Sequence, residues 1–136
     1  MSMSRSEIRE NVFKLLFRAE FNTQEEMPAQ TEYYFDVDTD GEISEEDREI
    51  ISKREEAVLS KLSDIDAAIS EKTVNWTIDR FGKVDLAIIR LAVFEILFDE
   101  NVPAGVAINE AVELAKKYGR DESKSFVNGV LAKFAK

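Results

Sequence analysis

The segment from Leu86 to Phe98 is apolar on almost every side of a helix, and it constrains the fold more than any other part of the chain. A helix that faces water on one side has an apolar stripe with a period of about 3.6 residues, whereas this segment would bury nearly its whole surface. Arg90 and Glu95 interrupt the run, which is also shorter than the roughly 20 apolar residues that a bilayer requires. We therefore expect a central helix surrounded by other helices.

The rest of the sequence also predicts helices. The chain has only two prolines and five glycines, and no stretch alternates apolar and polar residues with the period of a strand. We expect an all-α protein of about six to seven helices in two small packed bundles. Apart from short connecting helices, the predicted helices cover about 4–22, 28–35, 44–76, 85–99, 103–118 and 121–134. The break at Gly82 suggests one domain with an N-terminal subdomain, 1–76, that contains an acidic connector, 36–47, and a C-terminal subdomain, 77–136.

The residue types exclude several classes of function. The sequence has no cysteine and no histidine, so disulfides, zinc sites built on Cys or His, histidine acid–base catalysis and cysteine nucleophiles are excluded. It has no glycine-rich phosphate loop and no nucleophile-elbow motif, so we expect neither an enzyme nor a bound cofactor. The first ten residues are polar and charged, and no apolar core of a signal peptide follows, so we expect a cytoplasmic protein that does not bind membranes.

The charge is unevenly distributed along the chain. The net charge is −10, which argues against general affinity for nucleic acids. Residues 1–19 nevertheless carry four Arg or Lys against two Glu, and residues 116–136 carry six Arg or Lys against two acidic residues. If the two ends of the chain pack together, they form a modest basic patch on an acidic protein. Scattered basic helix ends fit the charges equally well.

The acidic connector 36–47 resembles a calcium-binding loop. Asp36, Asp38 and Asp40 fall at the positions that supply side-chain oxygens, and Gly41 falls where such a loop turns sharply. The twelfth position is Asp47 and not the usual bidentate Glu, and no second loop follows. The alternative, which we favour, is an acidic connector whose last residues begin a helix.

Two further sites have two interpretations each. Arg5 and Arg9 are four residues apart and therefore share one face of the first helix, where they would contact phosphates or pair with neighbouring Glu side chains. Spacing alone favours the pairing. Phe126 follows Lys124 near the start of the last helix, where an exposed ring could stack on a base, but its periodicity favours the core.

Three blocks of the C-terminal half resemble the NusB family. They are Lys-Val-Asp-Leu-Ala-Ile-Ile-Arg-Leu-Ala-Val-Phe-Glu at 83–95, Val-Pro-Ala-Gly-Val-Ala-Ile-Asn-Glu-Ala-Val-Glu-Leu-Ala-Lys-Lys-Tyr-Gly at 102–119 and Ser-Phe-Val-Asn-Gly-Val-Leu at 125–131. The first helix, with Arg9 and the Leu-Leu-Phe segment at 15–17, is also similar to the family's opening helix. The stretch 30–60 matches least.

The resemblance implies a non-enzymatic transcription antitermination factor. It implies binding to boxA-type single-stranded RNA together with the NusE-type small-subunit ribosomal protein, in a complex with other Nus factors and RNA polymerase that supports readthrough of ribosomal RNA operons. Some relatives dimerise, which leaves a homodimer open. Two alternatives are a calcium-binding helical protein that uses the loop 36–47, and a helical interaction module that has lost RNA binding.

The resemblance also implies which residues face the RNA. They lie at the start of the first helix, at the start of the central helix and in the approach to the last helix, and they are Arg5, Arg9, Phe17, Lys83, Asp85, Glu122, Lys124 and Phe126. Many relatives begin with a denser arginine cluster, whereas Glu7 and Glu10 intrude here. We therefore expect weak RNA binding by the isolated protein and useful affinity only with the partner.

Overall fold

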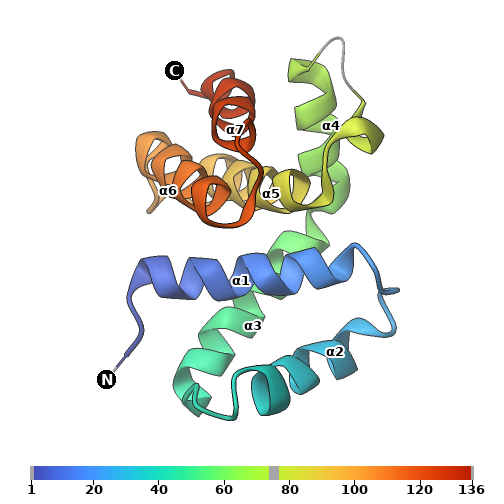
Figure 1. Ribbon diagram of the computed structural model, residues 1–136, viewed down its shortest axis with the longest axis vertical. Coiled ribbons are helices and arrows are strands. Elements are labelled where there is room, and N and C mark those ends of the chain that lie inside the picture. Colours follow the sequence, from blue (N-terminus) through green and yellow to red (C-terminus); the bar gives the residue numbers. More distant parts are fainter. Residues whose placement is uncertain (1, 74–76, 136) are drawn as a thin grey trace. The chain divides into compact units, whose positions relative to one another are not determined.

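All regular secondary structure is helical in the residues that the computed structural model describes, 2–73 and 77–135 (Figure 1). These residues form seven α-helices, one π-helical segment and one 3-10 turn, which confirms the predicted fold class. The elements are α1 (Arg5–Ala19), α2 (Met27–Tyr33), the π-helical η1 (Tyr34–Asp38), α3 (Glu45–Ser60), α4 (Leu62–Lys72), the 3-10 turn η2 (Ile78–Arg80), α5 (Lys83–Phe98), α6 (Ala104–Tyr118) and α7 (Ser123–Ala132). Contacts within the chain divide it into two compact units, residues 1–59 and 60–136.

The first unit contains α1, α2, η1 and α3. Its fully buried residues include Val12 and Leu15 of α1, three residues apart, and Ile51 and Val58 of α3, seven residues apart, so each pair lies on one helix face. A polar contact joins α2 to α3, because the Thr31 hydroxyl lies 3.1 and 3.0 Å from the two carboxylate oxygens of the buried Glu55.

A left-handed turn ends the π-helical segment and leads the chain toward α3. Asp40 and Gly41 both have positive φ angles, 53° and 67°. Glycine adopts this conformation without steric cost, and aspartate tolerates it better than most residues. The Thr39 backbone N–H donates to the Tyr34 carbonyl, and the Gly41 N–H donates to the Phe35 carbonyl. Asp40 and Gly41 therefore make a sharp turn at the end of the acidic connector's helical part.

The second unit is built around α5, as the sequence predicts. Nine residues of this helix are buried, and α4, α6 and α7 all contact it (Figure 1). α6 and α7 also pack on each other. Because three helices cover it, α5 needs no polar stripe, and its apolar surface is removed from water on several sides.

One predicted helix is wrong. The apolar seam over 44–76 indicates a single helix, but the structure has α3 and α4 with a break at Lys61, whose φ and ψ are −111° and 11°. Ile51 and Val58 belong to the first unit, while Ile65 and Ile69 belong to the second. The contacts thus place α4 with the second unit, whereas the sequence-based boundary at 76/77 leaves it in the first. Trp76, the last residue of the predicted seam, lies outside the described residues.

None of the described helices combines the length and the apolar character that a membrane crossing requires.

Candidate nucleic-acid interface

The start of α1 presents Arg5 to solvent. Arg5 is the first residue of the helix and is exposed. Ser4 caps the helix, since its hydroxyl accepts a hydrogen bond from the Glu7 backbone N–H at 3.1 Å and the Glu7 carboxylate accepts one from the Ser4 N–H at 2.9 Å. The bond from the Ser4 backbone lowers the pKa of Glu7 below its ordinary value. The capping box thus fixes the first helical turn, and Arg5 projects from it.

The other two predicted residues of α1 are less accessible. Arg9 is only 9% exposed, so little of its surface is available to a phosphate. Phe17 is half-buried, and its ring lies between those of Phe13 and Phe21, with centroid distances of 6.5 and 5.1 Å. Phe21, one turn further along, is 60% exposed. This aromatic row therefore leads from the core to the surface at the C-terminal end of α1.

The start of α5 carries Lys83 and Asp85. Lys83 is the first residue of the helix and is exposed, while Asp85 is half-buried in the first turn. A carboxylate near a helix N-terminus is favoured by the helix dipole. Among the residues that the structure describes, one of the Asp85 carboxylate oxygens is buried without a hydrogen-bond partner, so it keeps the capacity to accept a hydrogen bond.

The start of α7 lies beside the approach to α5 within the second unit. The Phe126 ring meets the Phe81 ring edge to face at a centroid distance of 5.1 Å, and α5 contacts α7. Phe81 is buried and precedes Lys83 by two residues, while Lys124 precedes Phe126 by two. The structure thus brings Lys83, Lys124 and Phe126 to neighbouring helix starts of one unit. We name these three residues and Phe81 the aromatic–lysine cluster.

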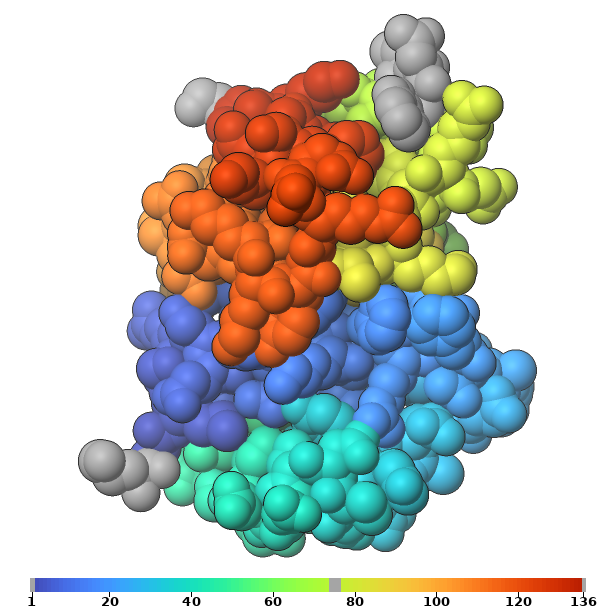
Figure 2. Space-filling view, viewed as in Figure 1, coloured from blue at the N-terminus to red at the C-terminus, as the bar shows by residue number. Residues whose placement is uncertain are grey.

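The rest of this region is open to solvent. Lys124 and Glu122 are exposed, and Phe126 is half-buried. The space-filling view shows the first residues of α7, in red-orange, at the surface of the second unit (Figure 2). Phe81 was not predicted as a site residue. Its position directly before the Gly-Lys-Val-Asp block at 82–85 is the signal that could have indicated it.

The connection between α6 and α7 is an unusually close turn. A Cβ atom on Gly119 would lie 2.5 Å from the Ser123 Cβ and 2.8 Å from the Ala115 carbonyl oxygen, so only glycine fits. Neither Asp121 nor Ser123, the residue types nearby that commonly cap helices, is the N-cap of α7. The N-cap residue is Glu122, without a side-chain cap bond, and the Ser123 hydroxyl accepts from the Arg120 backbone N–H at 2.9 Å. Ser123 thus fixes the turn that precedes Lys124.

The chemistry of these side chains suits RNA. Lysine and arginine neutralise phosphates, an aromatic ring stacks on bases, and carboxylates accept hydrogen bonds from the amino groups of bases. The described residues place Arg5, Arg9 and Phe17 in the first unit. Lys83, Asp85, Glu122, Lys124 and Phe126 lie in the second.

The acidic connector does not have the geometry of a calcium loop. Asp36 lies 2.9 Å from the Arg48 guanidinium, and Asp38 forms an ion pair with Arg18. Asp47 is buried and accepts a hydrogen bond from the backbone of Met3. Across residues 2–73 and 77–135, no three acidic side chains are grouped in a way that could hold a metal ion. These contacts do not support the calcium-binding alternative, because the carboxylates are directed to different partners.

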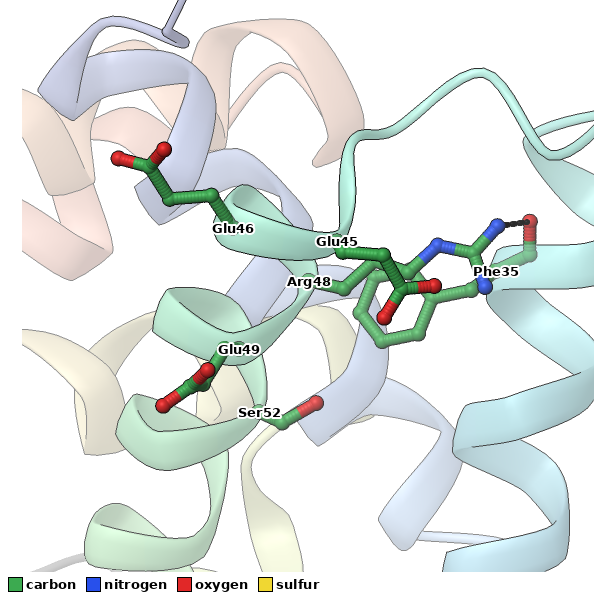
Figure 3. A pocket seen from close by; sticks show the side chains of 6 residues that line it. All are labelled: Phe35, Glu45, Glu46, Arg48, Glu49 and Ser52. Carbon is green, nitrogen blue, oxygen red and sulfur yellow. Dashed lines mark hydrogen bonds between the residues drawn. The ribbon is translucent and has the colours of Figure 1, made fainter.

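A groove of about 410 Å³ lies beside the acidic connector in the first unit (Figure 3). Its lining residues are Phe35, Glu45, Glu46, Arg48, Glu49 and Ser52. The Arg48 guanidinium stacks over the Phe35 ring, 5.4 Å from its centroid, and is already paired with Asp36. With three Glu side chains around an engaged Arg, this groove does not suit a phosphate.

Comparison with known proteins places the chain among antitermination factors. A model of the NusB family matches residues 6–136. The chain is 54% identical over 133 residues to the transcription antitermination protein NusB of Agathobacter rectalis, which covers 98% of this chain and 100% of that protein. It is 50% identical to the protein of the same name from Lachnoclostridium phytofermentans, over 96% of this chain and 98% of that protein.

Solved structures agree with this. NusB of T. maritima superposes with a TM-score of 0.83 at 34% identity, over 99% of this chain and 92% of that one. A crystal structure of the antitermination factors NusB and NusE in complex with double-stranded RNA contains a chain that superposes with a TM-score of 0.78 at 26% identity, over 96% of this chain and 94% of that one.

Proposed function

Because the chain belongs to the NusB family, we propose that it is a transcription antitermination factor that binds RNA together with a NusE-type ribosomal protein. The observation that carries this proposal is the match over nearly the whole chain to relatives that are antitermination proteins over their whole length. The RNA is of the boxA type, and the assembled complex includes other Nus factors and RNA polymerase. The protein acts in the cytoplasm as an adaptor and not as an enzyme.

The side chains that hold the RNA divide into three roles. Arg5, Lys83 and Lys124 are exposed cations that neutralise phosphates. Phe126 offers a ring at the surface for a base, and Phe81 supports that ring from the core. Of the remaining predicted residues, Asp85 and Glu122 accept hydrogen bonds from the amino groups of bases. The less accessible Arg9 and Phe17 support α1, from which Arg5 extends.

The acidity of the chain sets the affinity that these contacts can reach. A net charge of −10 repels RNA at long range, and the proposed RNA site opposes it with three exposed cations, Arg5, Lys83 and Lys124. Few neutralised phosphates release few counterions, so binding by the isolated protein is weak. A second weak contact through the ribosomal protein raises the apparent affinity, because the two contacts are linked on one scaffold.

The proposal is tested by titrating a fluorescent boxA RNA with this chain, with the NusE-type protein, and with both together. We expect weak binding by each protein alone and at least ten-fold tighter binding by the pair, the gain that linked contacts commonly exceed. A scrambled RNA of equal length is the control. Equal affinity for the two RNAs, or no gain with the ribosomal protein, would contradict the proposed function.

A further inference from the structure

A buried carboxylate ties the residues before α1 to α3. The Met3 backbone N–H donates to Asp47 Oδ2 at 3.2 Å, across 44 positions of the sequence. Asp47 is only 3% exposed, and both residues belong to the first unit. A carboxylate withdrawn from water is costly unless it accepts hydrogen bonds, so this contact is part of what makes its burial tolerable. Two segments far apart in sequence are thus linked by one side chain.

The position of Asp47 is itself set by its helix. Asp47 lies in the first turn of α3, and its backbone N–H donates to the Ser44 hydroxyl at 3.1 Å. This contact is the serine half of a capping box. The cap orders the turn from which the carboxylate extends. The first turn of α3 therefore holds Asp47 in place, and Asp47 in turn holds the N-terminal residues through Met3.

The anchored segment leads directly to Arg5. Met3 is followed by Ser4, which caps α1, and then by Arg5, its first residue. Asn11, one turn beyond Glu7 in α1, donates from its side-chain amide to the Glu7 carbonyl at 2.8 Å, and the same nitrogen lies 3.9 Å from the Met3 sulfur. Helix ends and chain termini fray unless something ties them down. Here the backbone is held by hydrogen bonds on both sides of Ser4, so the Arg5 side chain extends from an ordered helical turn.

We propose that Asp47 is a positioning residue for RNA binding, which acts through the Met3 N–H to hold Arg5 in place. The inference rests on the proposed function and assigns a supporting group to one of its contacts. An ordered Arg5 loses less conformational freedom when it meets a phosphate, so the complex is tighter. Asp47 would then strengthen RNA binding although it carries the same charge sign as RNA.

Positioning by Asp47 and long-range electrostatics predict opposite effects on RNA affinity when Asp47 is removed. Removing an acidic residue from an acidic protein strengthens RNA binding if only long-range electrostatics matters. We expect Asp47→Ala to weaken binding in the presence of the NusE-type protein, by roughly five-fold, the change expected for one hydrogen bond. Asp47→Asn keeps an acceptor oxygen and is expected to retain most of the affinity. The matched control is Glu46→Ala, which removes the same charge from an exposed neighbour on α3 and should leave binding equal or tighter.

A second variant breaks the same contact from its other side. Met3→Pro removes the donor N–H and leaves α3 intact, so it applies even if Asp47→Ala does not fold. We expect a similar loss of affinity, and faster amide hydrogen exchange at Ser4 and Arg5 in the free protein. RNA binding by Met3→Pro that equals wild type would overturn the inference.

A double-mutant cycle separates positioning from general destabilisation. If Asp47 acts through Arg5, then adding Asp47→Ala to Arg5→Ala costs little further affinity. Each single variant is also expected to lower the slope of log affinity against log salt by about 0.7. Additive losses would refute a role through Arg5. If Arg5→Ala weakens binding and Asp47→Ala does not, the positioning role alone fails. If wild type with its partner does not bind boxA RNA, the proposed function fails.

Discussion

Arg90 holds Asp66 through two parallel hydrogen bonds, from Nε to Oδ1 at 2.9 Å and from Nη2 to Oδ2 at 2.8 Å. The two side chains are 15% and 30% exposed, and they join α5 to α4 within the second unit. A bidentate pair between Arg and a carboxylate is among the stronger polar contacts in proteins. It also explains why the otherwise apolar α5 carries an arginine.

We expect Arg90→Ala to lower the free energy of unfolding by about 2 to 4 kcal/mol, because it leaves a partly buried Asp66 without its cation. Urea unfolding followed by circular dichroism measures this. Lys116→Ala is the control, since its ion pair with Glu113 is 52% and 67% exposed and should contribute less than about 1 kcal/mol. Equal effects of the two variants would show that the Arg90–Asp66 pair contributes no more to the free energy of unfolding than the exposed Lys116–Glu113 pair.

The turn at Gly119 gives a prediction with an internal control. Gly119→Ala forces a methyl group against Ser123 and the Ala115 carbonyl, and we expect a loss of about 1 to 3 kcal/mol. Gly129→Ala, within α7, meets no atom within 4 Å, and should gain up to about 1 kcal/mol from helix propensity. Thermal melts of both variants check the two signs. A stable Gly119→Ala protein would show that the turn relaxes at little cost.

Glu55 predicts a particular dependence of stability on pH. Burial raises its pKa from 4.5 to about 7, while the hydrogen bond from Thr31 opposes the rise. The folded protein therefore favours the protonated form. The stability that this group contributes is complete below about pH 4.5, and it is lost as the pH rises through 7.

Glu55→Gln should remove this part of the profile. Above pH 7 the variant is expected to be more stable than wild type, by on the order of 2 to 3 kcal/mol, and the difference should vanish toward pH 4.5. Urea unfolding of both proteins between pH 4.5 and 8 measures the difference. Glu46→Gln, at an exposed site on the same helix, is the control and should follow wild type. A constant difference between Glu55→Gln and wild type across this range would rule out the titration of Glu55 as its cause.

The aromatic–lysine cluster gives a prediction about salt. Lys83→Ala or Lys124→Ala should weaken binding of boxA RNA and lower the slope of log affinity against log salt by about 0.7, the contribution of one single-stranded phosphate contact. Lys53→Ala removes the same charge from an exposed pair with Glu49 on α3, and it should leave the slope unchanged. Titrations at several salt concentrations distinguish them. An equal change for all three variants would indicate an effect of net charge alone.

The two arginines of α1 are expected to differ. The proposed RNA site predicts that changing both Arg5 and Arg9 to alanine weakens RNA binding and flattens its salt dependence. Because Arg9 is 9% exposed and Arg5 is exposed, Arg5→Ala should account for the loss in salt dependence, and Arg9→Ala should mainly lower the melting temperature. Paired RNA titrations and thermal melts check this. A double variant that binds as tightly as wild type would remove both residues from the RNA site.

The sequence predicts the helices well where one core determines their pattern. The apolar run at 86–98 lies in the central helix α5. The division at Lys61 was missed because the apolar seam continues at helical spacing through the break, without a proline or glycine. Apolar residues at the same helical spacing pack into the first unit before Lys61 and into the second unit after it. Periodicity alone does not say which of the two cores a residue joins.

The candidate site, like the fold, was predictable from the sequence only in part. Motif resemblance indicates Lys83, Lys124 and Phe126, and the structure brings them together in the second unit. Phe81 and Asp47 were missed because their roles depend on contacts with residues 45 and 44 positions away. That the two basic ends of the chain act on one RNA stays a prediction from the charge pattern.

The close turn at Gly119 links the stability of the second unit to the position of Lys124. Any side chain at this position displaces Ser123, and the next residue along the chain is Lys124. If Lys124 contacts RNA as proposed, a substitution at Gly119 is expected to lower both the stability of the second unit and its affinity for RNA. A stabilising change elsewhere in the chain would restore the stability without returning the lysine to its place.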